Sequence, residues 1–305
     1  MAVLEGAMVY ANLLVLLSIG LTITYITTAV PNFAQGSMAI FGSYLSLTLW
    51  LLLNLHPYYS LPISFISGGA IGVAIYIFIL KPMIKKGIRV VTLMIATLAV
   101  DLIFLGILGS YSDTLSGLSG RAAKKFIFTP LDFELFGVDA ILWISSIVII
   151  LMLLTLFILL YKTKFGIALR ASMENPALAE IMGVDVENTR LFSWFLSGSL
   201  AATAGSLLPF RQEIVPSTGA LVIISIFAAS IVGGLRSLNG ALIGGYIIGI
   251  SESLITFHLS SLLGAGVLVY SKVVSLGVLV MALIFAPNGI AGIRGNLKWR
   301  WSTSY

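Results

Sequence analysis

The chain of 305 residues contains no cysteine and few charged residues. Without cysteine it has no disulfide bond, no thiolate nucleophile and no cysteine-ligated metal site. Charged side chains make up 10% of the sequence, whereas soluble domains average about a quarter. Hydrophobic residues make up 59%, and the mean hydropathy is +1.08. A soluble fold of this size could not keep so much apolar surface from water, so we expect most of the chain to lie in lipid.

Several signatures of other protein classes are missing as well. No basic segment precedes the first apolar run, so we expect no cleavable signal peptide. The net charge is +5, but the basic residues stand between apolar runs, which argues against nucleic-acid binding. The glycine-rich stretch 233–245 lacks the phosphate-loop pattern, and His56 and His258 lack an H-E-x-x-H spacing. The sequence therefore predicts no catalytic residue and no metal site.

Apolar runs long enough to cross a bilayer, about 20 residues each, fill most of the chain. The seventh run is short, so the sequence predicts an all-α, polytopic transmembrane helix bundle of eight or nine spans, forming a single domain over residues 1–305. The runs cover 8–30, 36–55, 62–80, 90–110, 139–161, 190–209, 219–234, 240–258 and 266–286. Two spans carry small residues every fourth position, which favours close helix packing in lipid. These residues are Ser193, Ser197, Ala201 and Gly205, and Ala241, Gly245, Gly249 and Ser253.

Lysine and arginine residues predict the orientation, because cytoplasmic loops are rich in them. With nine spans, most basic loop residues fall on one side, and the other side has only Arg121, Lys124, Lys125 and Arg211. This places the N-terminus outside, the C-terminus inside and segment 163–190 in the cytoplasm. The loop 111–138 is then extracytoplasmic.

The polar stretch "ALRASMENPALAEIMGVDVENTR", residues 168–190, interrupts the apolar chain. Asn175 can cap a helix whose first residue is Pro176, and Gly183 suits the position just after its end. Asp185 suits the N-cap of the next span. A separate helix of about two turns is unstable alone in water. It therefore needs a docking surface, either on the bundle or on another protein.

Polar residues inside apolar spans are candidates for a transport pathway, because they are costly in lipid and usually functional. The candidates are Asn32, Gln35, Asp101 and Glu252. Asn32 and Gln35 lie at the break between the first two spans, where a helix-breaking structural role is equally open. Asp101 and Glu252 could instead bond helices together, and Glu252 could pair with Lys272 near the start of the ninth span.

Four stretches of the chain, in order, resemble permeases of ABC importers for branched-chain amino acids, of the LivH/LivM type. They are "SIGLTITYITTAVPNFAQGSMAIFGSYLSL" (18–47), "TKFGIALRASMENPALAEIMGVDVENTRLFSWFLSGSLAATAG" (163–205), "IVGGLRSLNGALIGGYIIGISESL" (231–254) and "APNGIAG" (286–292). The resemblance implies a coupling helix that docks on a cytoplasmic ATPase subunit. Its contact positions would be Glu174, Ala177, Ala179, Glu180 and Gly183.

The resemblance also implies partners and a location. A second permease subunit, identical or related, would complete the pathway, and an extracytoplasmic binding protein would deliver the substrate. This chain would bind no cofactor, because ATP-Mg would lie on the partner ATPase subunits. The setting would be the cytoplasmic membrane of a prokaryote. Three alternatives stay open: a permease for urea, amides or another small solute, a stand-alone secondary transporter, and a membrane enzyme that uses His56 and His258.

Overall fold

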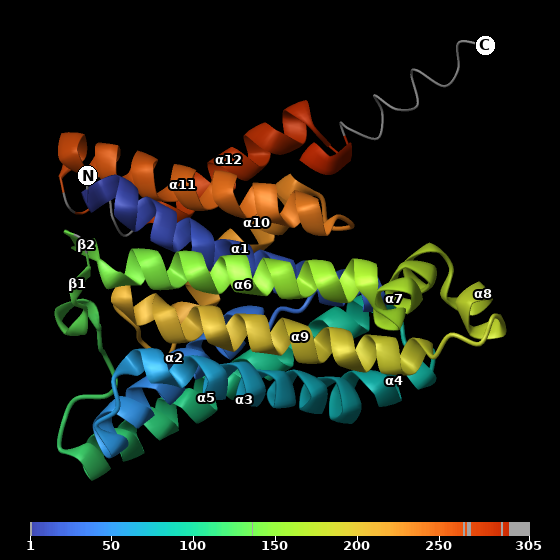
Figure 1. Cartoon of the computed structure of the whole chain (residues 1–305), viewed down its shortest axis with the longest axis horizontal. Coiled ribbons are helices and arrows are strands. Elements are labelled where there is room, and N and C mark those ends of the chain that lie inside the picture. Colours follow the sequence, from blue (N-terminus) through green and yellow to red (C-terminus); the bar gives the residue numbers. More distant parts are fainter. Residues whose placement is uncertain (1, 136, 265, 267–269, 288, 293–305) are drawn as a thin grey trace.

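The computed structural model describes residues 2–135, 137–264, 266, 270–287 and 289–292. Within them, eight helices are long and apolar enough to cross a membrane, and the shorter α10 is also apolar. The predicted all-α, polytopic bundle is thereby confirmed (Figure 1). The main helices of the bundle are α1 (Ala2–Thr28), α2 (Gln35–Leu53), α3 (Ser60–Ile75), α5 (Val90–Ser119), α6 (Ala140–Lys162), α9 (Val186–Leu207), α10 (Thr218–Gly233), α11 (Leu238–Leu263) and α12 (Ser271–Phe285). The short helices are η1 (Pro57–Tyr59), η2 (Tyr76–Leu80), α4 (Lys81–Lys85), η3 (Thr129–Leu131), α7 (Lys164–Glu174), α8 (Pro176–Ile181) and η4 (Leu208–Phe210).

The bundle has two distinct ends. At one end strands β1 (Glu134–Leu135) and β2 (Val138–Asp139) form a small antiparallel hairpin, and we name this the hairpin end. Helices α7 and α8 lie at the opposite end, which we name the coupling end (Figure 1). Helix α10 joins the two ends: Ile214, just before it, pairs with Phe126 near the hairpin, and Arg236, just after it, lines a pocket with Ser172 of α7. Helix α10 thus runs between the two ends of the bundle, where the short seventh span was predicted.

The interior of the bundle is built around α1 and α9, which are the most buried spans. Helix α1 packs against α11, α9 and α10, and α9 packs against α3 and α2. Helices α5, α6 and α12 lie at the periphery and expose most of their apolar surface. Such surfaces suit lipid or another transmembrane subunit, because lipid solvates apolar side chains without cost.

The predicted close helix packing at small residues is confirmed. A Cβ atom on Gly205 of α9 would clash with the backbone carbonyl of Ala39 on α2. On α11, a Cβ atom on Gly249 would collide with the backbone of Ala11 on α1. The two glycines therefore bring helix backbones into direct contact.

Replacing Gly205 with valine is expected to destabilise the bundle by about 3 kcal/mol or more, because overpacking forces two backbones apart. Gly106 of α5 offers a matched control, since a Cβ atom there would meet nothing within 4 Å. Gly205→Val should lower the yield of folded protein and its melting temperature in detergent, whereas Gly106→Val should change neither greatly. Equal melting temperatures for the two variants would show that the contact at Gly205 is not tight.

Two boundaries differ from the sequence-based expectation. The fourth span was expected to end near residue 110, but α5 continues to Ser119 and ends at Gly120, whose φ is +65°. The polar residues of its last turns resemble a loop sequence, yet no proline interrupts the helix before Gly120, so the loop that follows α5 is shorter than predicted. The stretch after Thr163 was expected to be loop, but Thr163 caps the separate helix α7.

Candidate functional site

The predicted short helix is α8, and both of its caps are confirmed. The Asn175 side chain accepts a hydrogen bond from the Leu178 N–H (3.1 Å). At the other end Gly183 has φ +84°, its N–H donates to the Glu180 carbonyl (3.0 Å), and the Val184 N–H donates to the Ala179 carbonyl (2.9 Å). This pair of bonds is the Schellman motif, which satisfies the last carbonyls of a helix. Helix α8 ends at Ile181, one residue earlier than predicted.

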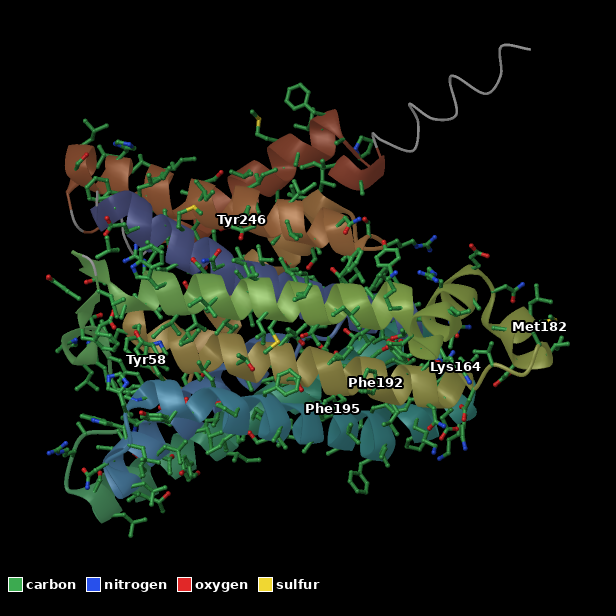
Figure 2. The ribbon with its side chains drawn as sticks, in the orientation of Figure 1. Tyr58, Lys164, Met182, Phe192, Phe195 and Tyr246 are labelled. Atoms are coloured by element: carbon green, nitrogen blue, oxygen red, sulfur yellow. The ribbon has the colours of Figure 1, made fainter. Side chains whose placement is uncertain are left out.

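Helix α8 projects from the coupling end and presents apolar side chains to its surroundings. Met182 lies at its tip, pointing away from the bundle (Figure 2). The exposed fractions of Leu178, Ile181 and Met182 are 56%, 81% and 76%. Ala179, by contrast, is buried within the chain. Exposed apolar residues gathered on so short a helix favour docking on another protein.

The other predicted contact positions surround this apolar tip. Glu174 and Glu180 are exposed, so their carboxylates are available to a partner. Gly183 makes the turn that ends α8 and also lines the groove next to it. The side chain of Ala177 lies outside the described part of the structure. The described surface of the segment is therefore an apolar tip flanked by acids.

The start of α9 anchors the segment 163–190, which we name the coupling segment, to the bundle. Asp185 caps α9 as predicted, accepting from the Asn188 N–H (2.9 Å). Glu187 in the first turn forms ion pairs with Lys81 and Lys85 of α4. The turn after α8 is thus joined to the start of α9, and α9 in turn is paired with α4.

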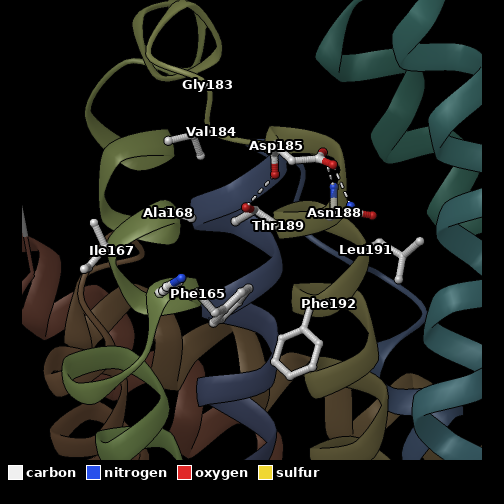
Figure 3. A pocket seen from close by; sticks show the side chains of 11 residues that line it. Phe165, Ile167, Ala168, Gly183, Val184, Asp185, Asn188, Thr189, Leu191 and Phe192 are labelled. Atoms are coloured by element: carbon white, nitrogen blue, oxygen red, sulfur yellow. Dashed lines mark hydrogen bonds between the residues drawn. The ribbon is translucent and has the colours of Figure 1, made fainter.

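A groove of about 650 Å³ separates α7 from the start of α9. Phe165 of α7 and Phe192 of α9 form its floor, with ring centroids 4.6 Å apart in an edge-to-face arrangement (Figure 3). The short connection through Val184 closes one side of the groove. This groove adjoins the turn that follows α8. The coupling segment therefore has a concave surface next to the exposed apolar residues of α8.

Asn32 and Gln35 lie fully buried at the centre of the bundle, where residues 29–34 break the helix. Ser197 of α9 donates its hydroxyl to Gln35 Oε1 (2.9 Å), and Asn32 Nδ2 donates to the same oxygen (3.1 Å). Asn32 Oδ1 accepts from the Ala34 N–H (3.1 Å). Non-helical backbone at membrane depth is tolerated where protein surrounds it. The two amides thus tie the break to α9.

Asp101 occupies a different environment. It lies on α5, one of the least covered spans, and is partly exposed. Its Oδ1 accepts a hydrogen bond from Ser37 of α2 (2.5 Å). A carboxylate that faces lipid is costly, so this face of α5 is expected to meet protein or water in an assembly.

Glu252 stands at the centre of a buried polar cluster near the hairpin end. The predicted pairing with Lys272 is confirmed, with 2.5 Å between Nζ and Oε1. Tyr10 donates to Oε1 of Glu252 (3.1 Å), and Ser225 (2.7 Å) and Ser275 (2.5 Å) donate to Oε2. The cluster joins α1, α10, α11 and α12. Sequence reasoning missed the three hydroxyl groups, because a hydroxyl within a span is equally typical of helix packing.

His56 lies in the connection after α2, and His258 lies within α11. His56 Nε2 lies 3.0 Å from the Leu131 carbonyl, at the hairpin end. Among the described residues, no group of three His, Asp or Glu side chains could hold a metal ion.

Comparison with known proteins assigns this chain to a family. A family described as "Branched-chain amino acid transport system / permease component" matches residues 3–283. The chain belongs to this permease family. It is a multi-pass membrane transport protein, and the predicted resemblance is confirmed. No solved structure matches the permease.

Three relatives show the range of the family. A probable branched-chain amino acid transport permease, LivH of Methanocaldococcus jannaschii, is 63% identical over 303 residues, covering 99% of this permease and 96% of the relative. BraD of Pseudomonas aeruginosa, a high-affinity branched-chain amino acid permease, is 26% identical over 288 residues, or 91% of each chain. LsrC of Escherichia coli, an autoinducer 2 import permease, is 31% identical over 252 residues, covering 79% of this permease and 66% of the relative. The relatives are transport proteins rather than enzymes.

Proposed function

We propose that this permease forms part of the pathway for branched-chain amino acids in an ATP-binding-cassette importer. The observation that carries the proposal is α8, a helix capped at both ends whose apolar tip projects from the bundle. A stand-alone transporter would have no use for such a helix. The 63% identity to a probable branched-chain amino acid permease supports this substrate over urea, amides or another solute.

In this proposal ATP-Mg binds to separate ATPase subunits that dock on α8, and the permease itself binds no cofactor. Closure of the ATPase pair would displace α8. The Schellman turn and the capped start of α9 make a short, hydrogen-bonded link, so the displacement would pass to α9. Helix α9 packs against α1, α2 and α3. Its movement would therefore shift the spans around it and alternate the access of the pathway.

A second permease subunit, identical or related, would cover the exposed face of α5. This proposal rests on Asp101, whose partly exposed carboxylate is costly against lipid. Asp101 would then lie beside the pathway. Asn32 and Gln35 would hold the helix break against α9, and Glu252 would bind α11 to its neighbours rather than contact substrate.

The orientation follows from the basic residues at the two ends. Lys81, Lys85, Lys164, Arg170 and Arg190 gather at the coupling end. We propose that this end faces the cytoplasm of a prokaryotic cell, because cytoplasmic loops are rich in lysine and arginine. An extracytoplasmic binding protein would deliver the substrate to the hairpin end.

Transport by the reconstituted complex tests the proposal. The permease is assembled with its ATPase subunits and second permease subunit in liposomes, and its binding protein is added outside. Radiolabelled leucine is expected to accumulate only when ATP is enclosed, and unlabelled isoleucine, but not urea, should compete. Leucine uptake by the permease alone, without ATP, would overturn the importer mechanism. Competition by urea and not by isoleucine would overturn the substrate.

A further inference from the structure

An apolar groove with two arginines at one end lies on the outside of the bundle, between α1, α6 and α11. Its volume is about 610 Å³. Ile19 of α1, Leu154 and Phe157 of α6, and Leu242 of α11 line its apolar part, and Arg170 and Arg236 line its end. We propose that this groove binds an anionic membrane phospholipid, with its headgroup phosphate on the two guanidinium groups and an acyl chain along α6.

The dimensions of the groove fit one leaflet of a bilayer. Its lining on α6 runs from Ile150 to Tyr161, so it extends roughly 16 Å along the helix axis. This length is about half of the hydrocarbon thickness of a typical bilayer, roughly 30 Å. Leu154 and Phe157 are more than half exposed, so an acyl chain could cover them. An acyl chain that begins at the coupling end would therefore end near the middle of the membrane.

The charged end of the groove suits a phosphate. Arg170 is held in place by a hydrogen bond to the Leu160 carbonyl (3.0 Å) and by the ring of Tyr161, whose centroid lies 5.5 Å from the guanidinium carbon. Arginine carries five N–H donors, and this bond uses one of them, so donors remain for phosphate oxygens. Arg236 lies opposite, immediately before α11. Both arginines are exposed, so neither is already neutralised by burial in an ion pair.

The N-terminus of α11 adds to this positive end. Ser237 caps the helix by accepting from the Gly240 N–H (3.1 Å), and Asn239 in the first turn also lines the groove. The first N–H groups of a helix carry a partial positive charge that favours anions. Glu174 is the acid that shares a neighbouring pocket with Arg236, and Arg190 lies in that pocket as well. The charged side chains lining the two pockets are thus three arginines and one carboxylate.

Lipid binding to the purified full-length permease tests the site. Photoactivatable phosphatidylglycerol should cross-link to residues 150–161 and 236–242, and unlabelled phosphatidylglycerol should compete far better than phosphatidylcholine. Arg170→Gln with Arg236→Gln should weaken binding about thirtyfold, because each basic side chain near an anionic lipid contributes about fivefold. The matched control is Lys86→Gln with Arg89→Gln, which removes the same charge from exposed positions of the same end outside the groove. The control should bind as the parent does.

The acyl part of the site has its own test, which leaves both arginines in place. Leu154→Trp fills the groove from an exposed position. It should displace the lipid and abolish the cross-links to 150–161. Equal binding by phosphatidylcholine, competition by inorganic phosphate alone, or unchanged cross-linking in Leu154→Trp would overturn the proposal. So would a photoreactive residue at position 154 that cross-links to a protein subunit of the complex instead of to lipid.

Discussion

Replacing Ile181 and Met182 together with lysine is expected to release the ATPase subunits while leaving the helix bundle folded. Both side chains are more than three-quarters exposed on α8 and its C-cap, so the substitution removes no internal packing. Apolar anchors at the centre of an interface typically contribute about 2 kcal/mol or more each. Affinity for the ATPase should therefore fall by about a thousandfold. The measurements are the amount of ATPase that co-purifies with the permease and ATP-dependent leucine uptake, which should fall to background.

Leu262→Lys with Leu263→Lys provides the matched control at the opposite end of the bundle. These residues end α11 and have exposed fractions of 82% and 70%, close to those of Ile181 and Met182. The control should keep its ATPase, because the hairpin end does not face the cytoplasm in the proposed orientation. Full retention of ATPase by the α8 variant, or equal loss in both variants, would show that α8 is not the docking helix.

The caps of α8 could be predicted from sequence because they are local. Asn175 and Gly183 act on backbone groups only a few residues away, and the φ of +84° at Gly183 is a conformation that glycine adopts without strain. The side on which the apolar residues of α8 would lie could not be predicted. That depends on how α7 and α9 approach each other in three dimensions, and the structure shows that Ile181 and Met182 face away from the bundle.

The polar residues of the spans show the same limit. The Glu252–Lys272 pair could be predicted because the two residues lie on successive spans that were expected to be neighbours. Tyr10 could not be assigned to the pair, since α1 and α11 are brought together by packing between distant parts of the chain. Likewise, the amides of Asn32 and Gln35 signalled a helix break, but only the structure shows that Ser197 of α9 donates a hydrogen bond to Gln35 and that Asn32 bonds to the same Gln35 oxygen.

Replacing Lys272 with methionine is expected to destabilise the permease by about 3–5 kcal/mol, because it leaves the Glu252 carboxylate buried without its counter-charge. In the parent, Lys272 Nζ donates to Glu252, to the Tyr10 hydroxyl (3.0 Å) and to the Ser225 hydroxyl (3.1 Å), so all three of its N–H groups are used. Adding Glu252→Gln to this variant removes the unpaired charge and should restore much of the stability. The measurement is the free energy of unfolding in mixed detergent micelles.

Lys125→Met is the matched control, because Lys125 pairs with Glu213 at 2.9 Å on the exposed surface of the hairpin end. Exposed ion pairs contribute about 1 kcal/mol or less, so this variant should unfold almost as the parent does. Equal losses at the two sites would contradict a stabilising role for the buried pair, as would a double variant no more stable than Lys272→Met.

The pair matters most for α12, in which Ser275 is the only buried residue. Because Ser275 and Lys272 both bond to Glu252 of α11, loss of the pair should free α12 first, and protease should cleave there before the rest of the bundle opens.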